Sequence, residues 1–418
     1  MMSKNIPQLR FEGFTYDWEE RKLSDVANHR GGTAIEKYFD KDGVYKVISI
    51  GSYGLNSQYV DQNIRAISNE ITDGRVVNSG ELTMVLNDKT ANGTIIGRTL
   101  LVEKDNEYVI NQRTEIISPK ENFDSNFAYT TLNGPFREKV KRIVQGGTQI
   151  YVNYPAVSNL NLELPKIEEQ QKIGSFFKHL DDTITLHQRK LDLLKEQKKG
   201  YLQKMFPKNG AKVPELRFAG FADDWEERKL SELATMNARI GWQNLRTSEF
   251  LDNGDYMLIT GTDFKAGAID YSNIHYVEKE RFEQDKKIQI SNKSILITKD
   301  GTLGKVAYVE GLTMPATLNA GVFNVKVKED LAIDSKYLFH YLKAPFLLKF
   351  ADQRSTGGTI KHLNQNVLVE FPIPLPSLGE QHKIAGLLSN FDNTIALHQR
   401  KLDLLKEQKK GFLQKMFV

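Results

Sequence analysis

No cysteine occurs among the 418 residues of the chain. This absence excludes disulfide bonds, iron–sulfur clusters, thiolate zinc sites and cysteine nucleophiles, and it suits a reducing compartment. The chain also lacks any apolar run close to the roughly 20 residues that span a bilayer, and its first residues, MMSKNIPQLR, contain no apolar core of a signal peptide. We therefore expect a cytoplasmic protein.

Strong charge of either sign is missing as well. The formal net charge is +4, which many ordinary globular proteins carry, so composition alone does not indicate a nucleic-acid partner. The eight histidines show no spacing typical of metal ligands, and we expect no bound metal. The length leaves room for two domains with separate hydrophobic cores.

What the chain does contain is a long internal repeat. LHQRKLDLLKEQKKGYLQKMF at 186–206 returns as LHQRKLDLLKEQKKGFLQKMF at 397–417, and the pair Tyr201 and Phe412 is the one difference. Such near-identity does not arise by chance, so the chain consists of two related halves.

A second repeat opens each half. PQLRFEGFTYDWEERKLSDVA at 7–27 returns as PELRFAGFADDWEERKLSELA at 214–234, whereas the middle segments 28–145 and 235–356 hardly align. Matched surfaces are expected to bind matched partners, and the two unlike middles are expected to bind two unlike targets.

The longer repeat lies in a predicted helix. Residues 168–206 and 379–417 contain no proline and are rich in helix formers, which corresponds to roughly 58 Å of helix each. Apolar residues follow the alternating four-and-three spacing of a coiled-coil seam. The predicted seam comprises Ile173, Phe177, Leu180, Ile184, Leu191, Leu194, Tyr201 and Met205 in the first copy, and Ile384, Leu388, Phe391, Ile395, Leu402, Leu405, Phe412 and Met416 in the second.

Polar residues interrupt this seam at matched positions, where they reduce stability but select one register. They are His187, Lys198, His398 and Lys409. Leu186, Leu193 and Leu202 form a second stripe, so each helix could contact its twin and a further partner. The alternative is that each helix simply packs on its own domain. For partner docking we select the exposed faces of both helices and the segments around Trp18 and Trp225.

Chain order predicts how the two helices pair. The opening repeat at 214–234 follows the end of the first helix closely, so by pseudo-symmetry residues 7–27 should lie beside the end of the second helix, with Val418 near the N-terminus. Antiparallel helices satisfy this requirement.

Both middles have the same predicted order of elements: strands followed by a helix. The strands are predicted at 44–51, 82–88, 94–102 and 113–118 with a helix at about 126–144, and at 256–263, 294–300, 305–311 and 322–327 with a helix at about 335–352.

A Gly-Gly-Thr sequence follows each of these helices, surrounded by basic and amide side chains. Paired glycines allow close approach to a phosphate, and Arg, Gln and Asn can make bidentate contacts to base edges. Our candidate DNA contacts are Arg142, Gln145, Gly146, Gly147, Gln149, Arg354, Gly357, Gly358, Lys361 and Asn364. The alternative is a helix C-cap surrounded by solvated charges.

The chain resembles the specificity subunit of type I restriction–modification enzymes. The resemblance is carried by the two opening motifs, the two Gly-Gly-Thr segments, and EEQQKIGSFF…LHQRKLDLLKEQKKGYLQKMF with its twin GEQHKIAGLL…LHQRKLDLLKEQKKGFLQKMF. The resemblance covers the full chain. It implies that each unlike middle reads one half of an asymmetric, bipartite DNA target. It also implies that the repeated helices form an antiparallel coiled coil that sets the spacer and docks two modification subunits.

The expected fold is α+β: two similar mixed α/β recognition domains, separated by a pair of long antiparallel coiled-coil helices, with an internal pseudo-two-fold repeat. The expected domains are recognition domain 1 at 1–165, the central helix at 166–206, recognition domain 2 at 207–376 and the distal helix at 377–418.

Catalytic motifs are missing from the sequence. There is no Asn-Pro-Pro-Tyr or Asp-Pro-Pro-Tyr pocket and no glycine-rich methyl-donor loop, so a self-sufficient nuclease or methyltransferase is disfavoured. We expect a non-catalytic chain without cofactors, whose methyl donor, ATP and magnesium are bound by the modification and restriction subunits that the resemblance implies. The competing hypothesis is a two-headed adaptor that binds two proteins and no DNA.

Overall fold

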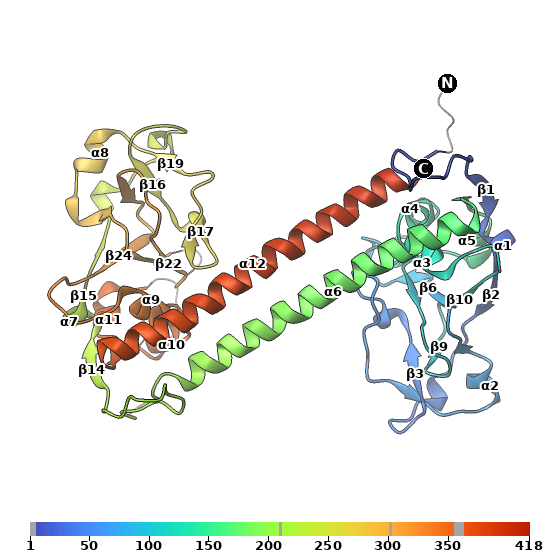
Figure 1. Ribbon diagram of the computed structural model, residues 1–418, viewed down its shortest axis with the longest axis horizontal. Helices are drawn as coiled ribbons and strands as arrows, with labels where there is room; N and C mark the ends of the chain where they lie inside the picture. Colours follow the sequence, from blue (N-terminus) through green and yellow to red (C-terminus); the bar gives the residue numbers. More distant parts are fainter. Residues whose placement is uncertain (1–5, 209–210, 301–302, 355–362) are drawn as a thin grey trace. The chain divides into compact units, whose positions relative to one another are not determined.

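The computed structural model describes residues 6–208, 211–300, 303–354 and 363–418. It divides into two compact units: unit 1 comprises Met1–Gln188 with Lys401–Val418, and unit 2 comprises Arg189–Arg400. Both long helices, α6 (Ile167–Lys204) and α12 (Leu378–Met416), therefore contribute to both units (Figure 1). The predicted domain boundaries follow the repeat rather than this packing, and they stay predictions.

Unit 1 is built from short strands and short helices around the end of α6. The strands are β1 (Glu19–Lys22), β2 (Ala27–Gly31), β3 (Tyr45–Ile48), β4 (Arg65–Ala66), β5 (Val76–Val77), β6 (Leu82–Val85), β7 (Asn87–Asp88), β8 (Thr99–Leu101), β9 (Tyr108–Ile110), β10 (Thr114–Pro119), β11 (Gln145–Gly146), β12 (Ile150–Tyr151) and β13 (Asn161–Leu164). The helices are α1 (Leu23–Val26), α2 (Glu70–Asp73), α3 (Ser125–Asn133), α4 (Pro135–Lys141) and α5 (Tyr154–Ser158).

Unit 2 follows the same plan. Its strands are β14 (Glu226–Lys229), β15 (Ala234–Ala238), β16 (Met257–Ile259), β17 (Phe264–Lys265), β18 (Ala268–Ile269), β19 (His275–Tyr276), β20 (Gln289–Ile290), β21 (Ile295–Thr298), β22 (Val306–Tyr308), β23 (Ala316–Leu318), β24 (Val322–Val327) and β25 (Pro372–Leu375). Its helices are α7 (Leu230–Leu233), α8 (Lys279–Glu283), α9 (Ser335–Lys343), α10 (Phe346–Gln353) and α11 (Gln365–Leu368).

Three sheets of unit 1 correspond in strand order to three sheets of unit 2. In unit 1 the orders are β1-β13, β2-β10-β6-β8 and β4-β3-β9-β5, and in unit 2 the orders β14-β25, β15-β24-β21-β22 (extended by β18-β17) and β19-β16-β23-β20 repeat them. The directions also agree, because β3 pairs with β9 and β16 with β23 in parallel, while their outer neighbours are antiparallel. The prediction of one α+β fold used twice is confirmed.

The single helix expected after each set of strands is wrong in both units. In unit 1 the helix breaks between α3 and α4, where the Gly134 amide closes the last turn on Thr130 and Thr131 and Pro135 follows. In unit 2 it breaks between α9 and α10, at Ala344 before Pro345. A proline disfavours the helical conformation of the residue before it, so each break has a local cause.

The cores of the two units are matched at their centres. Trp18, which is 2% exposed, packs edge-on against Phe127 and Phe417 in unit 1. Trp225, which is 5% exposed, does the same against Phe206 and Tyr337 in unit 2. The tryptophan of each opening repeat thus packs in a core against a phenylalanine at the C-terminal end of a repeated helix. Among the helices in the described ranges, none combines the length and the apolar character needed to cross a bilayer.

Candidate nucleic-acid interface

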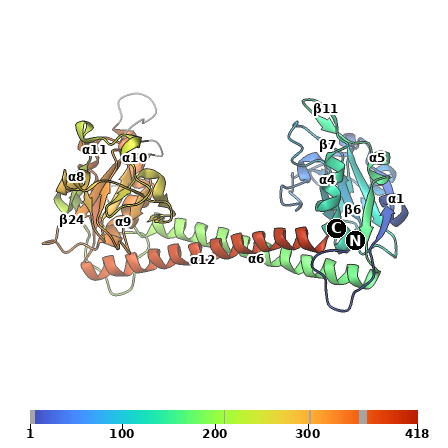
Figure 2. The same ribbon diagram turned by 90° about the horizontal axis from the view of Figure 1, so that it is seen from above.

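The first Gly-Gly-Thr segment forms the turn of a hairpin in unit 1. Strands β11 and β12 pair in antiparallel fashion, and β12 also pairs with β7, which gives a separate three-stranded sheet (Figure 2). Gly146 has φ +101°, and a Cβ built on it would lie 2.2 Å from the carbonyl oxygen of Gln149. Only glycine closes this turn without strain.

The hairpin brings the five predicted DNA contacts of unit 1 together. All five are exposed or half-buried on the hairpin or on the turn leading into it: Arg142, Gln145, Gly146, Gly147 and Gln149. The buried side chain of Ile150 and the hydrogen bond from the Val152 amide to the Leu86 carbonyl attach the hairpin to the core. Contact of these five residues with DNA stays a prediction.

Other basic residues that precede the hairpin have structural roles. The buried guanidinium of Arg137 donates to the carbonyls of Gly93, Thr94 and Ile96 at 2.8–3.0 Å. Desolvation, followed by the nearby charge of Arg98, lowers the pKa of Arg137 to about 10. Lys139 pairs with Glu163, and Lys141 pairs with Glu138. These three residues precede Arg142 in the sequence, and all three have partners within unit 1.

The corresponding segment of unit 2 is described only in part. Gly357, Gly358 and Lys361 lie outside the described residues. The guanidinium of Arg354 lies 3.8 Å from the centre of the Phe350 ring at the end of α10. Asn364 caps α11, since its side-chain oxygen accepts from the Asn366 amide at 2.9 Å. Both sides of the Gly-Gly-Thr segment are thus anchored to helices.

The repeated helices pack antiparallel within each unit. In unit 1, Phe176 packs edge-on against Phe412 at 5.0 Å between ring centres, and further along α6 Asp181 pairs with Lys409. In unit 2, the rings of Tyr201 and Phe391 lie 5.3 Å apart, and Lys198 pairs with Asp392. Rising numbers in α6 meet falling numbers in α12 in both units, which confirms the antiparallel prediction. The lysines that interrupt the predicted seam are therefore paired with aspartates.

Every predicted seam residue is buried or half-buried. Ile173 and Phe177 belong to the core of unit 1, and Ile384 and Leu388 belong to the core of unit 2, so these ends of the helices also serve the domains. The remaining predicted interface residues are Leu180, Ile184, Leu191, Leu194, Tyr201, Ile395, Leu402, Leu405, Phe391 and Phe412.

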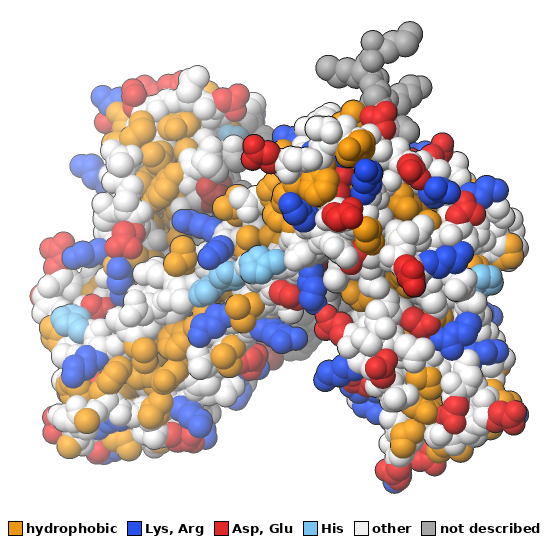
Figure 3. Space-filling view, turned by 45° about the vertical axis from the view of Figure 1, so that its right-hand side comes forward, with side chains coloured by type: hydrophobic (Ala, Val, Ile, Leu, Met, Phe, Trp, Pro, Cys, Tyr) orange, Lys and Arg blue, Asp and Glu red, His pale blue; other side chains and the backbone are white. Residues whose placement is uncertain are grey.

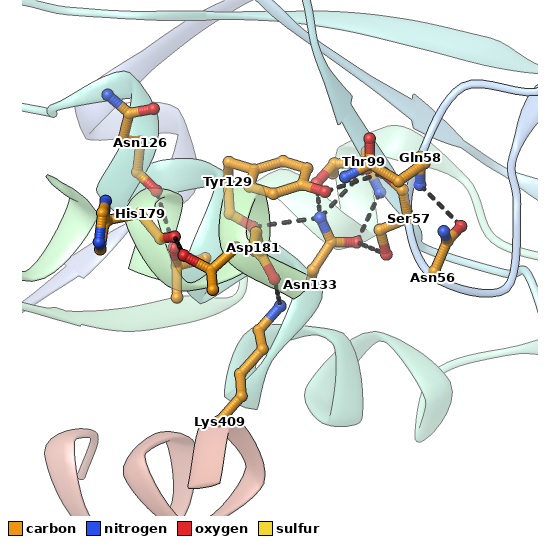
Figure 4. Close-up of polar contacts among 12 residues, drawn as sticks. Asn56, Ser57, Gln58, Thr99, Asn126, Tyr129, Asn133, His179, Asp181 and Lys409 are labelled. Atoms are coloured by element: carbon orange, nitrogen blue, oxygen red, sulfur yellow. Dashed lines mark hydrogen bonds and ion pairs between the residues drawn. The ribbon is translucent and has the colours of Figure 1, made fainter. Parts of the chain in front are cut away.

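Figure 4 shows how unit 1 is organised beside the Asp181–Lys409 pair. The Tyr129 hydroxyl donates to the Ser57 carbonyl at 2.8 Å, and the Asn133 side chain accepts from the Ser57 hydroxyl and from the Thr99 amide. These bonds hold the loop around Ser57 against α3. Between this loop and α12 lies an open cavity of about 600 Å³.

Polar contacts attach the start of α6 to unit 1 and the start of α12 to unit 2, and none of the sequence motifs indicated them. Arg10 makes two hydrogen bonds to the buried Glu169, and Arg217 makes the same two to the buried Glu380. The glutamine that follows each glutamate also makes a matched contact. Gln170 accepts from the Asp124 amide before α3 at 3.0 Å, and Gln381 accepts from the Asp334 amide before α9 at 2.9 Å. The recurrence of Arg, Glu and Gln at matched positions of both repeats was the available signal.

The indoles of Trp18 and Trp225 are buried in the cores, and docking of a partner on the segments around them stays a prediction. By contrast, four leucines at matched repeat positions are each at least half exposed: Leu186, Leu193, Leu397 and Leu404. The face seen in Figure 3 mixes both signs of charge with scattered apolar groups. Among the described residues, no group of three acidic or histidine side chains is placed to hold a metal.

A buried histidine distinguishes unit 2. Desolvation lowers the pKa of His340 to about 3, and its Nε2 lies 2.9 Å from the Ser389 hydroxyl. Lys343 and Asp392 lie beside it, with a hydrogen bond of 3.2 Å between them. His340 and Lys343 stand where unit 1 has Thr130 and Asn133, whereas Asp392 matches Asp181 of unit 1. Both junctions of helix and domain therefore contain an aspartate–lysine pair, and that of unit 2 adds a histidine.

Comparison with known proteins agrees with this architecture. A family model described as type I restriction modification DNA specificity domain matches residues 16–196 and 222–407. The type I restriction enzyme MjaVIII specificity subunit of Methanocaldococcus jannaschii is 22% identical over 409 residues, covering 95% of this chain and 91% of that protein. The EcoR124I/EcoR124II specificity subunit of Escherichia coli is 27% identical over 146 residues, or 34% of this chain and 35% of that protein.

A solved structure shares the fold. The crystal structure of the S subunit of a type I restriction–modification system from M. genitalium superposes with a TM-score of 0.69 over 99% of both chains, at 16% identity. Since the family model matches both halves of the chain, and the repeat, the paired long helices and the duplicated sheets accompany that match, the protein belongs to the type I restriction–modification DNA specificity family.

Proposed function

We propose that the chain is the sequence-specificity subunit of a type I restriction–modification complex and that each unit reads one half of a bipartite, asymmetric DNA target. The chain itself is non-catalytic. The observation that carries the proposal is the combination of one duplicated sheet order with unlike polar side chains around the two Gly-Gly-Thr segments. The backbone of DNA is nearly two-fold symmetric while its base sequence is not, so equivalent frameworks with different reading residues suit a split target without a palindrome.

The helices set the spacer in this proposal. Both α6 and α12 are continuous, with 38 and 39 residues, and each enters both units, so their length limits which half-site spacings the chain accepts. Removing one heptad from each helix shortens each by about 10 Å, or roughly three base pairs. We expect such a double deletion to bind a shorter spacer or to lose binding. Unchanged preference for the original spacer would contradict this role.

The partners in this proposal are two modification subunits, which bind the methyl donor, and restriction subunits, which use ATP and magnesium. The near-identity of the two helix copies supports two equivalent docking surfaces, since packing alone does not require it. The exposed leucines of the repeat supply apolar area for docking. This chain would then need no cofactor of its own, and it would act in the cytoplasm beside the DNA.

A selection experiment tests the proposal. The full chain, with and without its modification subunits, is incubated with duplexes that carry two random blocks separated by spacers of several lengths, and the bound duplexes are sequenced. Enrichment of one split sequence at one spacing is expected. No enrichment under either condition would contradict DNA reading and would favour a protein-binding adaptor.

A further inference from the structure

Three strands far apart in the sequence align a row of side chains in unit 1. In the register of the small sheet, Gln145 is opposite Tyr151, and Tyr151 is opposite Asn87. Directly opposed residues of neighbouring strands point to the same face. The row across this face is therefore amide, aromatic ring, amide.

The two faces of this sheet differ sharply in burial. On the inner face, Ile150 is 6% exposed and Asp88 is 3% exposed. On the outer face Gln145 is exposed, Tyr151 is 39% exposed and Asn87 is half-buried. In the part of the chain that the structure describes, no hydrogen bond engages the side-chain amide of Asn87 or Gln145. Both amides are thus available to a ligand.

The inner face holds the sheet rigid. The Asp88 carboxylate accepts from the Thr90 amide, the Thr90 hydroxyl and the Ile95 amide, each at 2.9 Å. Burial opposes ionisation of Asp88, but these hydrogen bonds outweigh it, so the pKa of this carboxyl lies below its ordinary value. Arg137 holds the far end of the same loop through the carbonyls of Gly93, Thr94 and Ile96. A surface held in one conformation before binding loses less entropy when it binds.

Resting on the DNA-reading function proposed above, we infer that the outer face formed by Asn87, Tyr151 and Gln145 is the base-reading surface of unit 1 and that it recognises an A·T-containing half-site. The major groove admits a two-stranded β-ribbon, and the side-chain amides of Asn and Gln match the N6 and N7 atoms of adenine. The exposed ring between them offers an apolar surface to a thymine methyl group. Asn87 and Tyr151 are specificity residues in addition to Gln145.

The test uses the full chain in complex with its modification subunits and the duplex selection described above. Asn87→Ala and Gln145→Ala are each expected to weaken discrimination at one or two base pairs of a single half-site, by about tenfold to a hundredfold. Asn87→Asp is expected to change the preferred base there from adenine toward cytosine, because a carboxylate accepts from the cytosine N4 amine. The other half-site and the spacer should stay the same.

Asn122→Ala provides the matched control, since Asn122 is an exposed amide of unit 1 outside this sheet and its carbonyl, not its side chain, accepts from Gln170. Thermal unfolding of all variants should match that of the wild type. If the wild type selects a split sequence and the three variants select the same one with equal discrimination, the inference is overturned and the proposed function stands. If the wild type selects no sequence, both are overturned.

Discussion

Gly146 is the residue on which the reading hairpin depends most directly. Its φ is +101°, and an added Cβ would lie only 2.2 Å from the Gln149 carbonyl oxygen, so no side chain fits there. Gly146→Ala should therefore open the hairpin and lower DNA affinity, while the rest of unit 1 keeps its melting temperature to within a few degrees. Gly74→Ala is the matched control, because Gly74 lies in unit 1 outside the hairpin, its φ is −66°, and a Cβ there would lie 3.4 Å from its nearest neighbour, the Glu70 carbonyl oxygen. Equal DNA affinity of the two variants in a gel shift would show that the hairpin closes in another way.

His340 should make the chain sensitive to acid. Its pKa is about 3 in the folded chain and its ordinary value is 6.5, so between these values the unfolded state binds more protons. The free energy of unfolding contributed by this group therefore falls as pH falls below 6.5, by roughly 1 kcal/mol per pH unit. Besides Asp392, which favours protonation, the charges acting on it are Lys198, Lys343 and Lys336.

Replacing this histidine isolates the effect. His340→Gln should reduce the loss of stability between pH 7 and pH 5, as measured by urea unfolding at each pH. His179→Gln serves as the control, because His179 is exposed on α6. If His340→Gln and the wild type lose the same stability over this range, other groups control the acid response.

At the scale of the helix, one face packs against the domains and the twin helix, and the other is exposed, where the proposed modification subunits would dock. Leu186 and Leu397 occupy the same position in the two repeats, and both are exposed. Changing both to Gln should weaken binding of the modification subunits by about tenfold or more, because each loses an apolar contact, while thermal unfolding stays unchanged. Binding is measured by calorimetry. Lys195→Gln with Lys406→Gln, also exposed repeat positions, should have a smaller effect, and an equal effect of both pairs would contradict a leucine-based surface.

At the scale of the whole molecule, the same backbone contact occurs once in each unit. In unit 1 it joins segments from the two ends of the sequence, and in unit 2 it joins segments from its middle. The Leu9 amide donates to the Lys415 carbonyl at 2.8 Å, and the Leu216 amide donates to the Lys204 carbonyl at 2.9 Å. Leu9 and Lys415 of unit 1 therefore occupy the places that Leu216 and Lys204 occupy in unit 2. This equivalence follows from the repeat and from the antiparallel helices.

A circular permutant tests this equivalence. With the old termini joined by a short linker and new ends placed within 207–213, the chain should fold and select the same DNA sequence as the wild type. Its melting temperature should lie within a few degrees of the wild-type value, because no buried contact is removed. Failure to fold, seen as loss of the cooperative unfolding transition, would show that the two connections are not equivalent.

Much of the architecture could be predicted because it depends on repeats and on local spacing that the sequence shows directly. The duplicated segments predicted two equivalent units, the seam spacing predicted both long helices, and their order predicted the antiparallel pairing and the closeness of the ends. Even the missed break at Gly134–Pro135 had a local signal. These features depend on neighbours in sequence or on symmetry between the copies.

The tertiary structure alone decided which polar residues face outward. Arg137 and Lys139 resemble Arg142 in sequence, yet Arg137 is held by carbonyls of the loop before β8 and Lys139 by Glu163 on β13. Asn87 joins Gln145 and Tyr151 in one row only because β7 pairs with β12, a strand far along the chain. Local pattern determines whether a segment is helix or strand, whereas the direction of a side chain depends on strand register and on long-range packing, which no local pattern specifies.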